Sequence, residues 1–293
     1  MIARSRSGPL ALLAAMTAGA AAANPPGDGC SVTVQQLGET HVSPYNALQG
    51  GEYSEPIRLR LWNKGNQDCT GTVTLRNDFG SAILTRAGGG EFTYSIADEH
   101  DRSATIFDPA TNTSEPVPVS IPPGKFVEIQ PRFIVPGGQQ GRAGHYATLL
   151  EAHFRQDGQV TDELGDVSLA VDVMPTAEAN FVGYGRDATL DLGELAPGVS
   201  GSIGLQIRAS ADVDVEVSSQ SHGNLLHTGG GAIPYTMTVD GQTVDFSGKD
   251  RRHLDLPNAV RGKTVPIDVL VGSFERAPVG QYGDVVTFRI SAR

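Results

Sequence analysis

The residues that could do chemistry are scattered along this chain. Seven histidines are present, and none falls in the H-E-x-x-H or H-x-H spacing that holds a zinc ion. His222 and His227 flank a short loop, where a solvated role is favoured over a metal pair. Asp98–Asp101 is predicted to form a charged turn, where a calcium site would need further ligands from other positions in the chain. No G-x-S-x-G elbow or phosphate-binding loop is present. We therefore expect no enzyme activity, no cofactor and no metal.

The two cysteines, Cys30 and Cys69, carry the clearest chemical prediction. A metal site would need more ligands at short spacing, and a redox pair is usually C-x-x-C. In an exported protein an even pair predicts a disulfide. The bond would close a loop of about 40 residues, worth roughly 3–4 kcal/mol in the chain-entropy model. We expect it to staple neighbouring strands.

The amino terminus predicts export. Arg4 and Arg6 precede a short apolar run, and Ala21–Ala23 resembles a cleavage site before Asn24. Residues 1–23 are therefore predicted to be a signal peptide, too short in its apolar part to span a bilayer. No lipobox-like sequence precedes Cys30, so we expect no lipid anchor.

The charge of the chain excludes two classes of partner. The net charge is −11, and removal of the two signal-peptide arginines makes it about −13. Nucleic acid and anionic lipid both require clustered Lys and Arg. The longest basic cluster, residues 249–252, is interrupted by Asp250. We expect neither nucleic-acid binding nor a membrane span.

Alternating apolar residues predict an all-β protein. Residues 57–61, 203–207 and 265–271 alternate with period two, and turn residues recur about every 8–12 residues along the chain. Helical periodicity longer than a turn or two is lacking. The pattern predicts two immunoglobulin-like sandwiches in tandem, over residues 24–175 and 176–293.

The two predicted sandwiches differ at their ends. A Gly-x-Tyr pattern opens a strand at Gly144 and again at Gly280. After the first copy, a turn at 155–159 leads to a further alternation that ends at Val173. After the second copy, the sequence ends at Arg293. We therefore expect the second sandwich to lack its closing strand.

Three stretches carry a family resemblance. Leu190–Leu195, Tyr235–Gly241 and Pro278–Phe288 resemble the spore coat protein U-like domain, in which a Leu-x-Phe-Gly strand, an apolar-Tyr strand and a closing Pro-x-Gly-x-Tyr-x-Asp strand recur. That family includes subunits of archaic chaperone–usher pili, whose sandwiches are completed by a donor strand. The chain departs from it in having no cysteine pair in the second half.

The resemblance implies a fimbrial subunit, and a two-domain member without an N-terminal donor arm resembles the tip adhesin. It implies passage through the periplasm to the cell surface and a role in adhesion or biofilm formation. The implied partners are a periplasmic chaperone, an outer-membrane usher, a neighbouring subunit and a host or abiotic surface.

Two sets of apolar residues are the candidate contact sites. We expect the donor-strand groove at Leu190, Leu192, Val286, Phe288 and Ile290. Ligand-contact loops are expected at Tyr45, Leu48, Phe79, Ile83 and Leu84, if these residues are exposed rather than folded onto the core. Two alternatives stay open: a free-standing carbohydrate- or protein-binding module with two closed sandwiches, and an enzyme with a metal at the His222/His227 loop.

Overall fold

The computed structural model describes residues 29–77, 82–99, 107–108, 112–156, 162–254 and 259–293. The predicted signal peptide, Phe79 and most of the 155–159 turn lie outside these ranges. Within them every regular element is a β-strand apart from the 3₁₀ turn Ala259–Arg261, which confirms the all-β prediction. None of the elements in these ranges is a helix with the length and apolar character needed to cross a membrane. Below, "first half" means residues 29–175 and "second half" means residues 176–293.

The first half folds into three sheets. The largest has the order β2-β15-β14-β5-β10-β9, with β11 beside β5 and β6 beside β14, and the others are β1-β4-β12 and β3-β13-β8. The strands are β1 Val32–Gln36, β2 Thr40–Tyr45, β3 Tyr53–Pro56, β4 Leu59–Asn63, β5 Cys69–Arg76, β6 Ile83–Thr85, β7 Glu91–Thr93, β8 Ser95–Ala97, β9 Phe107–Asp108, β10 Thr113–Ser114, β11 Val117–Ile121, β12 Phe126–Ile129, β13 Arg132–Val135, β14 Gly144–Gln156 and β15 Asp162–Val173.

The second half folds into two sheets, one of order β16-β17-β23-β20-β19-β24 and one of order β22-β18-β25. Its strands are β16 Ala177–Phe181, β17 Ser200–Ala209, β18 Val213–Ser219, β19 Asn224–His227, β20 Ala232–Val239, β21 Gln242–Thr243, β22 Asp250–Leu254, β23 Lys263–Val271, β24 Tyr282–Gly283 and β25 Val286–Ala292.

Each half has its own core. The buried clusters of the first half draw on residues up to Val173, and the buried cluster of the second half begins at Leu205. In both halves the inward residues alternate along the strands, as in β23, where Val265, Ile267, Val269 and Val271 are buried and the residues between them are exposed. The predicted boundary at 175/176 falls between the two cores and stays a prediction.

The Cys30–Cys69 disulfide is present, with the two Cα atoms 5.0 Å apart, which confirms the predicted pairing. Cys30 lies just before β1 and Cys69 begins β5, and these strands belong to different sheets. The bond therefore joins the two faces of the sandwich, and the expectation that it joins neighbouring strands is wrong. Both cysteines pack into a small apolar cluster with Leu61 and Phe154.

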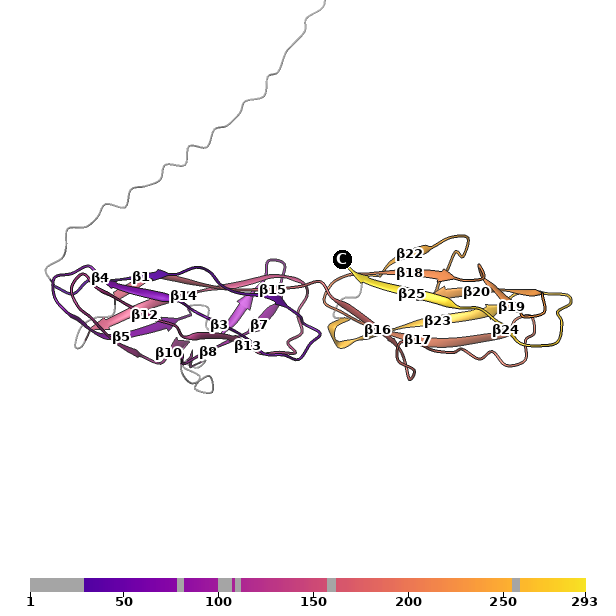
Figure 1. Cartoon of the computed structure of the whole chain (residues 1–293), viewed down its shortest axis with the longest axis horizontal. Coiled ribbons are helices and arrows are strands. Elements are labelled where there is room, and N and C mark those ends of the chain that lie inside the picture. The colour runs from indigo at the N-terminus through magenta and orange to yellow at the C-terminus, as the bar shows by residue number, and fades with distance from the viewer. Residues whose placement is uncertain (1–28, 78–81, 100–106, 109–111, 157–161, 255–258) are drawn as a thin grey trace, which may run out of the picture.

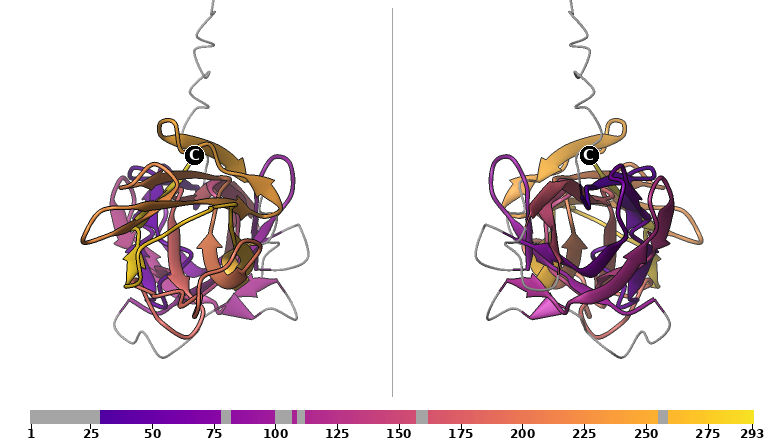
Figure 2. Two further views of the ribbon diagram at one scale, coloured as in Figure 1. Left: turned by 90° about the vertical axis from the view of Figure 1, so that its right-hand side faces the viewer. Right: turned by 90° about the vertical axis from the view of Figure 1, so that its left-hand side faces the viewer.

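The two halves lie end to end in an elongated molecule (Figure 1), and views along the long axis show one behind the other (Figure 2). Ser210, which is buried, ties the connecting segment: its Oγ donates to the carbonyl of Met174 at 2.8 Å and accepts from the amide of Thr176 at 2.9 Å. Across the junction Arg142 forms an ion pair of 2.7 Å with Asp212.

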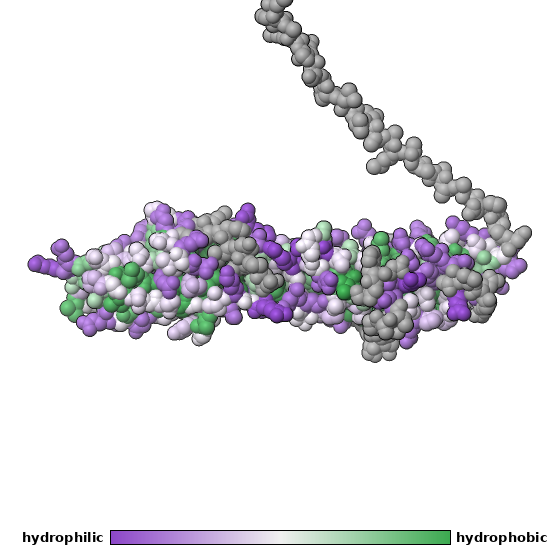
Figure 3. All heavy atoms as spheres, turned by 180° about the vertical axis from the view of Figure 1, so that it is seen from behind, coloured by the Kyte–Doolittle hydropathy of each residue, from purple (hydrophilic) through white to green (hydrophobic). Residues whose placement is uncertain are grey.

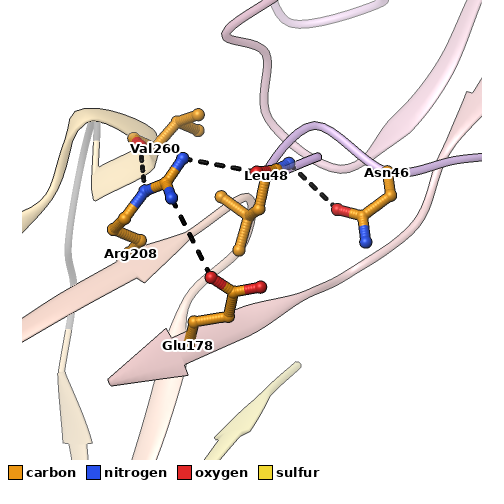
Figure 4. A network of polar contacts seen from close by, with 5 residues as sticks. All are labelled: Asn46, Leu48, Glu178, Arg208 and Val260. Carbon is orange, nitrogen blue, oxygen red and sulfur yellow. Dashed lines mark hydrogen bonds and ion pairs between the residues drawn. The ribbon is translucent and has the colours of Figure 1, made fainter. Parts of the chain in front are cut away.

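Arg208 adds a second set of contacts at this junction (Figure 4). Its Nη2 reaches the carbonyl of Leu48 in the first half at 3.4 Å, and its Nε donates to the carbonyl of Val260. Glu178 lies 3.9 Å from the same guanidinium. The Leu48 contact crosses the junction, while Val260 and Glu178 hold the Arg208 guanidinium from within the second half.

Candidate functional site

The two Gly-x-Tyr motifs define equivalent strands in the two halves. Gly144 and Gly280 have φ of 141° and 152°, a region that favours glycine. The hydroxyl of Tyr146 donates to the carbonyl of Arg142 at 2.8 Å, and that of Tyr282 donates to Pro278 at 2.8 Å. A tyrosine bonded to backbone a few residues upstream marks the start of strand F in immunoglobulin-like sandwiches. β14 in the first half and β24–β25 in the second therefore hold the same place.

In the first half this strand is paired along both edges. β14 pairs antiparallel with β5 on one side and with β15 on the other. β15 in turn pairs in parallel with β2. The first half therefore contains its own closing strand, as the sequence predicts.

In the second half β25 pairs along one edge alone, within the part of the chain that the structure describes. Its partner is β18, with Val215 opposite Ile290. Just beyond the two ends of this ladder, the amide of Gln220 donates to the carbonyl of Val285 and the amide of Arg293 donates to the carbonyl of Asp212. These two bonds show which residues of β25 form the hydrogen-bonded pairs with β18. Hydrogen-bonded pairs alternate in an antiparallel ladder, so the N–H and C=O groups of Val286, Phe288 and Ile290 are directed away from β18. These backbone groups line an open edge.

A second open edge lies opposite. β16 pairs with β17 and has no other ladder partner among the described strands. By the same alternation, Ala177 and Ala179 direct their backbone groups away from β17. Phe181 differs, because a turn with Gly185 satisfies its amide and carbonyl.

Apolar side chains fill the space between these edges without being fully covered. Counted from the tyrosine, Val286, Phe288 and Ile290 occupy the places of Leu150, Ala152 and Phe154. The first-half residues are almost completely buried, whereas the three second-half residues are partly exposed. The ring of Phe181 meets that of Phe288 edge-on, with centroids 5.9 Å apart, so side chains and not backbone bonds bridge the two edges.

The predicted strand at Leu190–Gly193 is wrong, because residues 187–193 have no ladder partner or regular structure. Leu190 and Leu192 nevertheless turn inward over β17, since a Cβ on Gly201 would lie 2.7 Å from Leu192 and 3.1 Å from Leu190. In the first half, the strand that follows β1 is β2, and β2 pairs with β15. The segment after β16 has no such strand beside it among the described residues.

Asp284 anchors the start of β25. Its carboxylate accepts hydrogen bonds from the hydroxyls of Ser219 and Tyr235 and from the amide of Ser221, at 2.5, 2.6 and 3.0 Å. Burial opposes ionisation of this carboxyl, but the hydrogen bonds outweigh it and hold the pKa of Asp284 below its ordinary value. Burial, and then the contact with the Asp284 carboxylate, raise the pKa of the Tyr235 hydroxyl above its ordinary value.

The structure does not support the predicted ligand-contact loops as an exposed patch. Tyr45 and Leu84 are fully buried and Leu48 is nearly so, while Ile83 is partly buried. Tyr45 packs against Phe92 with ring centroids 5.1 Å apart, and its hydroxyl donates to Pro136. Of the two readings that the sequence left open, the structure therefore supports the one in which these large apolar side chains fold onto the core.

Among the described residues of the first half, an exposed aromatic contact lies elsewhere. Trp62 and Phe126 are opposite each other on β4 and β12, with rings stacked 5.4 Å apart, and the Arg60 guanidinium lies 4.5 Å above Phe126. The alternation Ile57, Leu59, Leu61 implied that Trp62 faces outward, and this signal was missed. Exposed large apolar residues also occur in the second half, and Figure 3 shows apolar patches there.

The histidine loop does not form a metal pair. His222 Nδ1 lies 3.3 Å from the carbonyl of Phe246, and the His227 ring packs on Tyr282. Among the described residues, three potential metal ligands converge in one place: His41, His145 and Asp172. These residues are far apart in the sequence, so no spacing pattern could have indicated them.

Comparison with known proteins gives structural likenesses to pilus adhesins. No protein-family model matches the chain, and no curated protein does. The CsuC–CsuE chaperone–tip adhesion subunit complex of the archaic chaperone-usher Csu pili of Acinetobacter baumannii matches at 17% identity and a TM-score of 0.45, covering 90% of this chain and 100% of that one.

Two further solved structures are similar over most of the chain. CfaE, the adhesive subunit of the CFA/I fimbria of enterotoxigenic Escherichia coli, matches at 10% identity and a TM-score of 0.38, covering 89% of this chain and 81% of that one. The CupB6 tip adhesin of Pseudomonas aeruginosa matches at 11% identity and a TM-score of 0.36, covering 91% and 95%. At such identities and TM-scores these likenesses decide nothing about what this chain binds.

Proposed function

We propose that the chain is an exported subunit of a chaperone–usher pilus, placed at the tip, whose second half accepts an extended strand from another polypeptide. The observation that carries the proposal is the pair of open edges, β25 and β16, on either side of a partly exposed apolar row. The first half has the closing strand β15 at the equivalent place.

An added strand would supply partners both for the open backbone groups of the sheet edge and for the partly exposed apolar side chains beside it. Open sheet edges pair with other chains unless something covers them. A donor would bond to the backbone of Val286, Phe288 and Ile290, and its alternate side chains would enter the row between the sheets. By analogy with β15 beside β14, the donor runs antiparallel to β25. Its source is a periplasmic chaperone during export and a neighbouring subunit in the fibre.

The first half is proposed to contact the host or abiotic surface. It is closed by its own β15 and stapled by the Cys30–Cys69 disulfide, so it needs no partner strand. The stacked Trp62 and Phe126 give it an exposed aromatic contact surface. Adhesion and biofilm formation are the roles that the family resemblance implies.

A fusion tests the donor-strand proposal directly. A flexible linker and a strand of about ten residues with alternating valine and threonine are added after Arg293. The matched control carries the same linker with asparagine in place of each valine. The first fusion should raise the melting temperature of the second half by at least about 5 °C and suppress aggregation, while the control should behave like the parent.

Equal melting temperatures for both fusions and the parent would refute an open acceptor site. A free-standing binding module with two closed sandwiches also predicts a stable, soluble monomer without a partner. Sedimentation of the unmodified protein therefore provides a second test. Open edges predict association that increases with protein concentration, whereas closed sandwiches predict a monomer.

A further inference from the structure

Three potential metal ligands from neighbouring strands of the first half meet on the outer face of the large sheet. His41 lies on β2, His145 on β14 and Asp172 on β15. His145 stands directly opposite Asp172, and His41 pairs with Ala170, two residues before the aspartate. Their neighbours in the chain, such as Val42, Tyr146 and Val171, are buried, so the three side chains share the outward face.

The ligand atoms are already close together. His145 Nδ1 lies 2.8 Å from one carboxylate oxygen of Asp172, and His41 Nε2 lies 2.9 Å from the other. All three ligand atoms fall within 4.8 Å of one another.

One of these atoms lacks a well-directed partner. His41 Nε2 is buried from solvent and has no hydrogen bond of acceptable geometry among the described residues, although the carboxylate is within ion-pair distance. A buried polar atom of this kind is costly unless something else satisfies it. A metal ion between the three groups would do so.

We propose that His41, His145 and Asp172 bind one divalent transition-metal ion, with zinc as the best match. Two imidazoles and a carboxylate suit zinc, whereas calcium and magnesium prefer oxygen ligands alone. Zinc bonds of ~2.0–2.2 Å place tetrahedral ligand atoms roughly 3.4 Å apart, which small side-chain rotations can reach here. The His145 side chain is 62% exposed, so the fourth position opens to solvent.

Such a site would clamp the closing strand of the first half. β2 is an edge strand whose parallel pairing with β15 is irregular, with a register shift near its end. An ion held by β2, β15 and β14 would tie this edge to the sheet. Because metal that binds the folded state raises stability by mass action, the first half should unfold at higher temperature when zinc is present.

Untagged protein, with its disulfide intact, is titrated with ZnCl₂ in a calorimeter, and CoCl₂ serves as a spectroscopic substitute. We expect one ion per chain. His145→Ala and Asp172→Asn should each weaken binding at least 10-fold and abolish the zinc-dependent rise in melting temperature. The control is His153→Ala on β14, because the His153–Glu151 pair offers two groups and not three.

Because the His145 side chain is mostly exposed, the His145→Ala variant should fold like the parent, and circular dichroism without metal checks this. If Asp172→Asn does not fold, His145→Ala alone decides the question. Absence of zinc binding in the parent at 0.1 mM metal, roughly the weakest affinity of functional interest, would overturn the proposal. So would binding that survives His145→Ala unchanged.

Discussion

Replacing Asp284 by asparagine should destabilise the second half and leave the first half unchanged. In the native protein one carboxylate oxygen accepts the hydroxyls of Ser219 and Tyr235, and the other accepts the amides of Ser221 and Val285. Asparagine has a single acceptor oxygen. The asparagine oxygen should turn toward the two backbone amides, because an amide N–H can only donate a hydrogen bond. The asparagine NH₂ should then face the two hydroxyls, whose oxygens can accept a hydrogen bond.

The size of the effect follows from the loss of charge. A hydrogen bond to a charged group contributes about 1.5–3 kcal/mol and a neutral one about 0.5–1.5 kcal/mol. All four bonds lose their charged partner in Asp284→Asn. The two hydroxyl bonds alone, by changing from the first kind to the second, should lower the free energy of unfolding by about 2 kcal/mol. Tyr235→Phe removes one bond to the charged carboxylate altogether and should cost a similar amount, about 1.5–3 kcal/mol.

A single tryptophan allows the unfolding of the two halves to be followed separately. Trp62 is the one tryptophan, and it lies in the first half. Urea unfolding followed by circular dichroism should therefore show an earlier transition in Asp284→Asn, shifted by about 1 M. Trp62 fluorescence should show no shift.

The effect should depend on pH. The folded pKa of Asp284 is lowered, so its contribution is complete above the unfolded carboxyl pKa, ordinarily 3.8, and is lost as pH falls through the lower folded value. The stability difference between parent and Asp284→Asn should shrink from about pH 5 downward. Equal stability at pH 7, or a difference that does not shrink in acid, would refute this reasoning.

Three further predictions concern other contacts. The double variant Cys30→Ser with Cys69→Ser should lower the free energy of unfolding of the first half by about 4 kcal/mol, because the unfolded chain regains the entropy of the loop that the bond closes across a separation of 39 residues. Trp62 fluorescence should detect the change, and an unchanged unfolding midpoint would contradict it. Gly280→Ala should destabilise the second half by more than about 2 kcal/mol, because its φ is 152° and a Cβ would meet His227, whereas the open position Gly283→Ala should be tolerated. Ser210→Ala should cost about 1–3 kcal/mol in thermal unfolding by leaving the Met174 carbonyl and Thr176 amide unpaired, and no loss would show that water replaces the hydroxyl.

The sequence predicted the features that arise from local periodicity. Alternation located the long strands, including β14, β15, β17, β23 and β25, and the cysteine count predicted the disulfide. Short strands such as β9, β10 and β21 could not be found, because two residues are too few to show a period.

Features that depend on distant partners were beyond local reasoning. Leu190–Gly193 has a strand-like pattern but forms no strand, because a strand needs a neighbour and none of the described segments pairs with it. Tyr45 lies in turn-like sequence yet is buried by tertiary packing. The meeting of His41 with Asp172 depends on a parallel strand pairing across 131 residues, which no local pattern encodes.

Amide hydrogen exchange along β25 tests the central claim most directly. In the protein without a donor, the amides of Thr287, Arg289 and Ser291 should exchange slowly because they face β18, while those of Val286, Phe288 and Ile290 should exchange much faster. Adding the valine–threonine donor strand should slow the second set and leave the first unchanged. Uniformly slow exchange of all six amides before any donor is added would contradict an open acceptor edge.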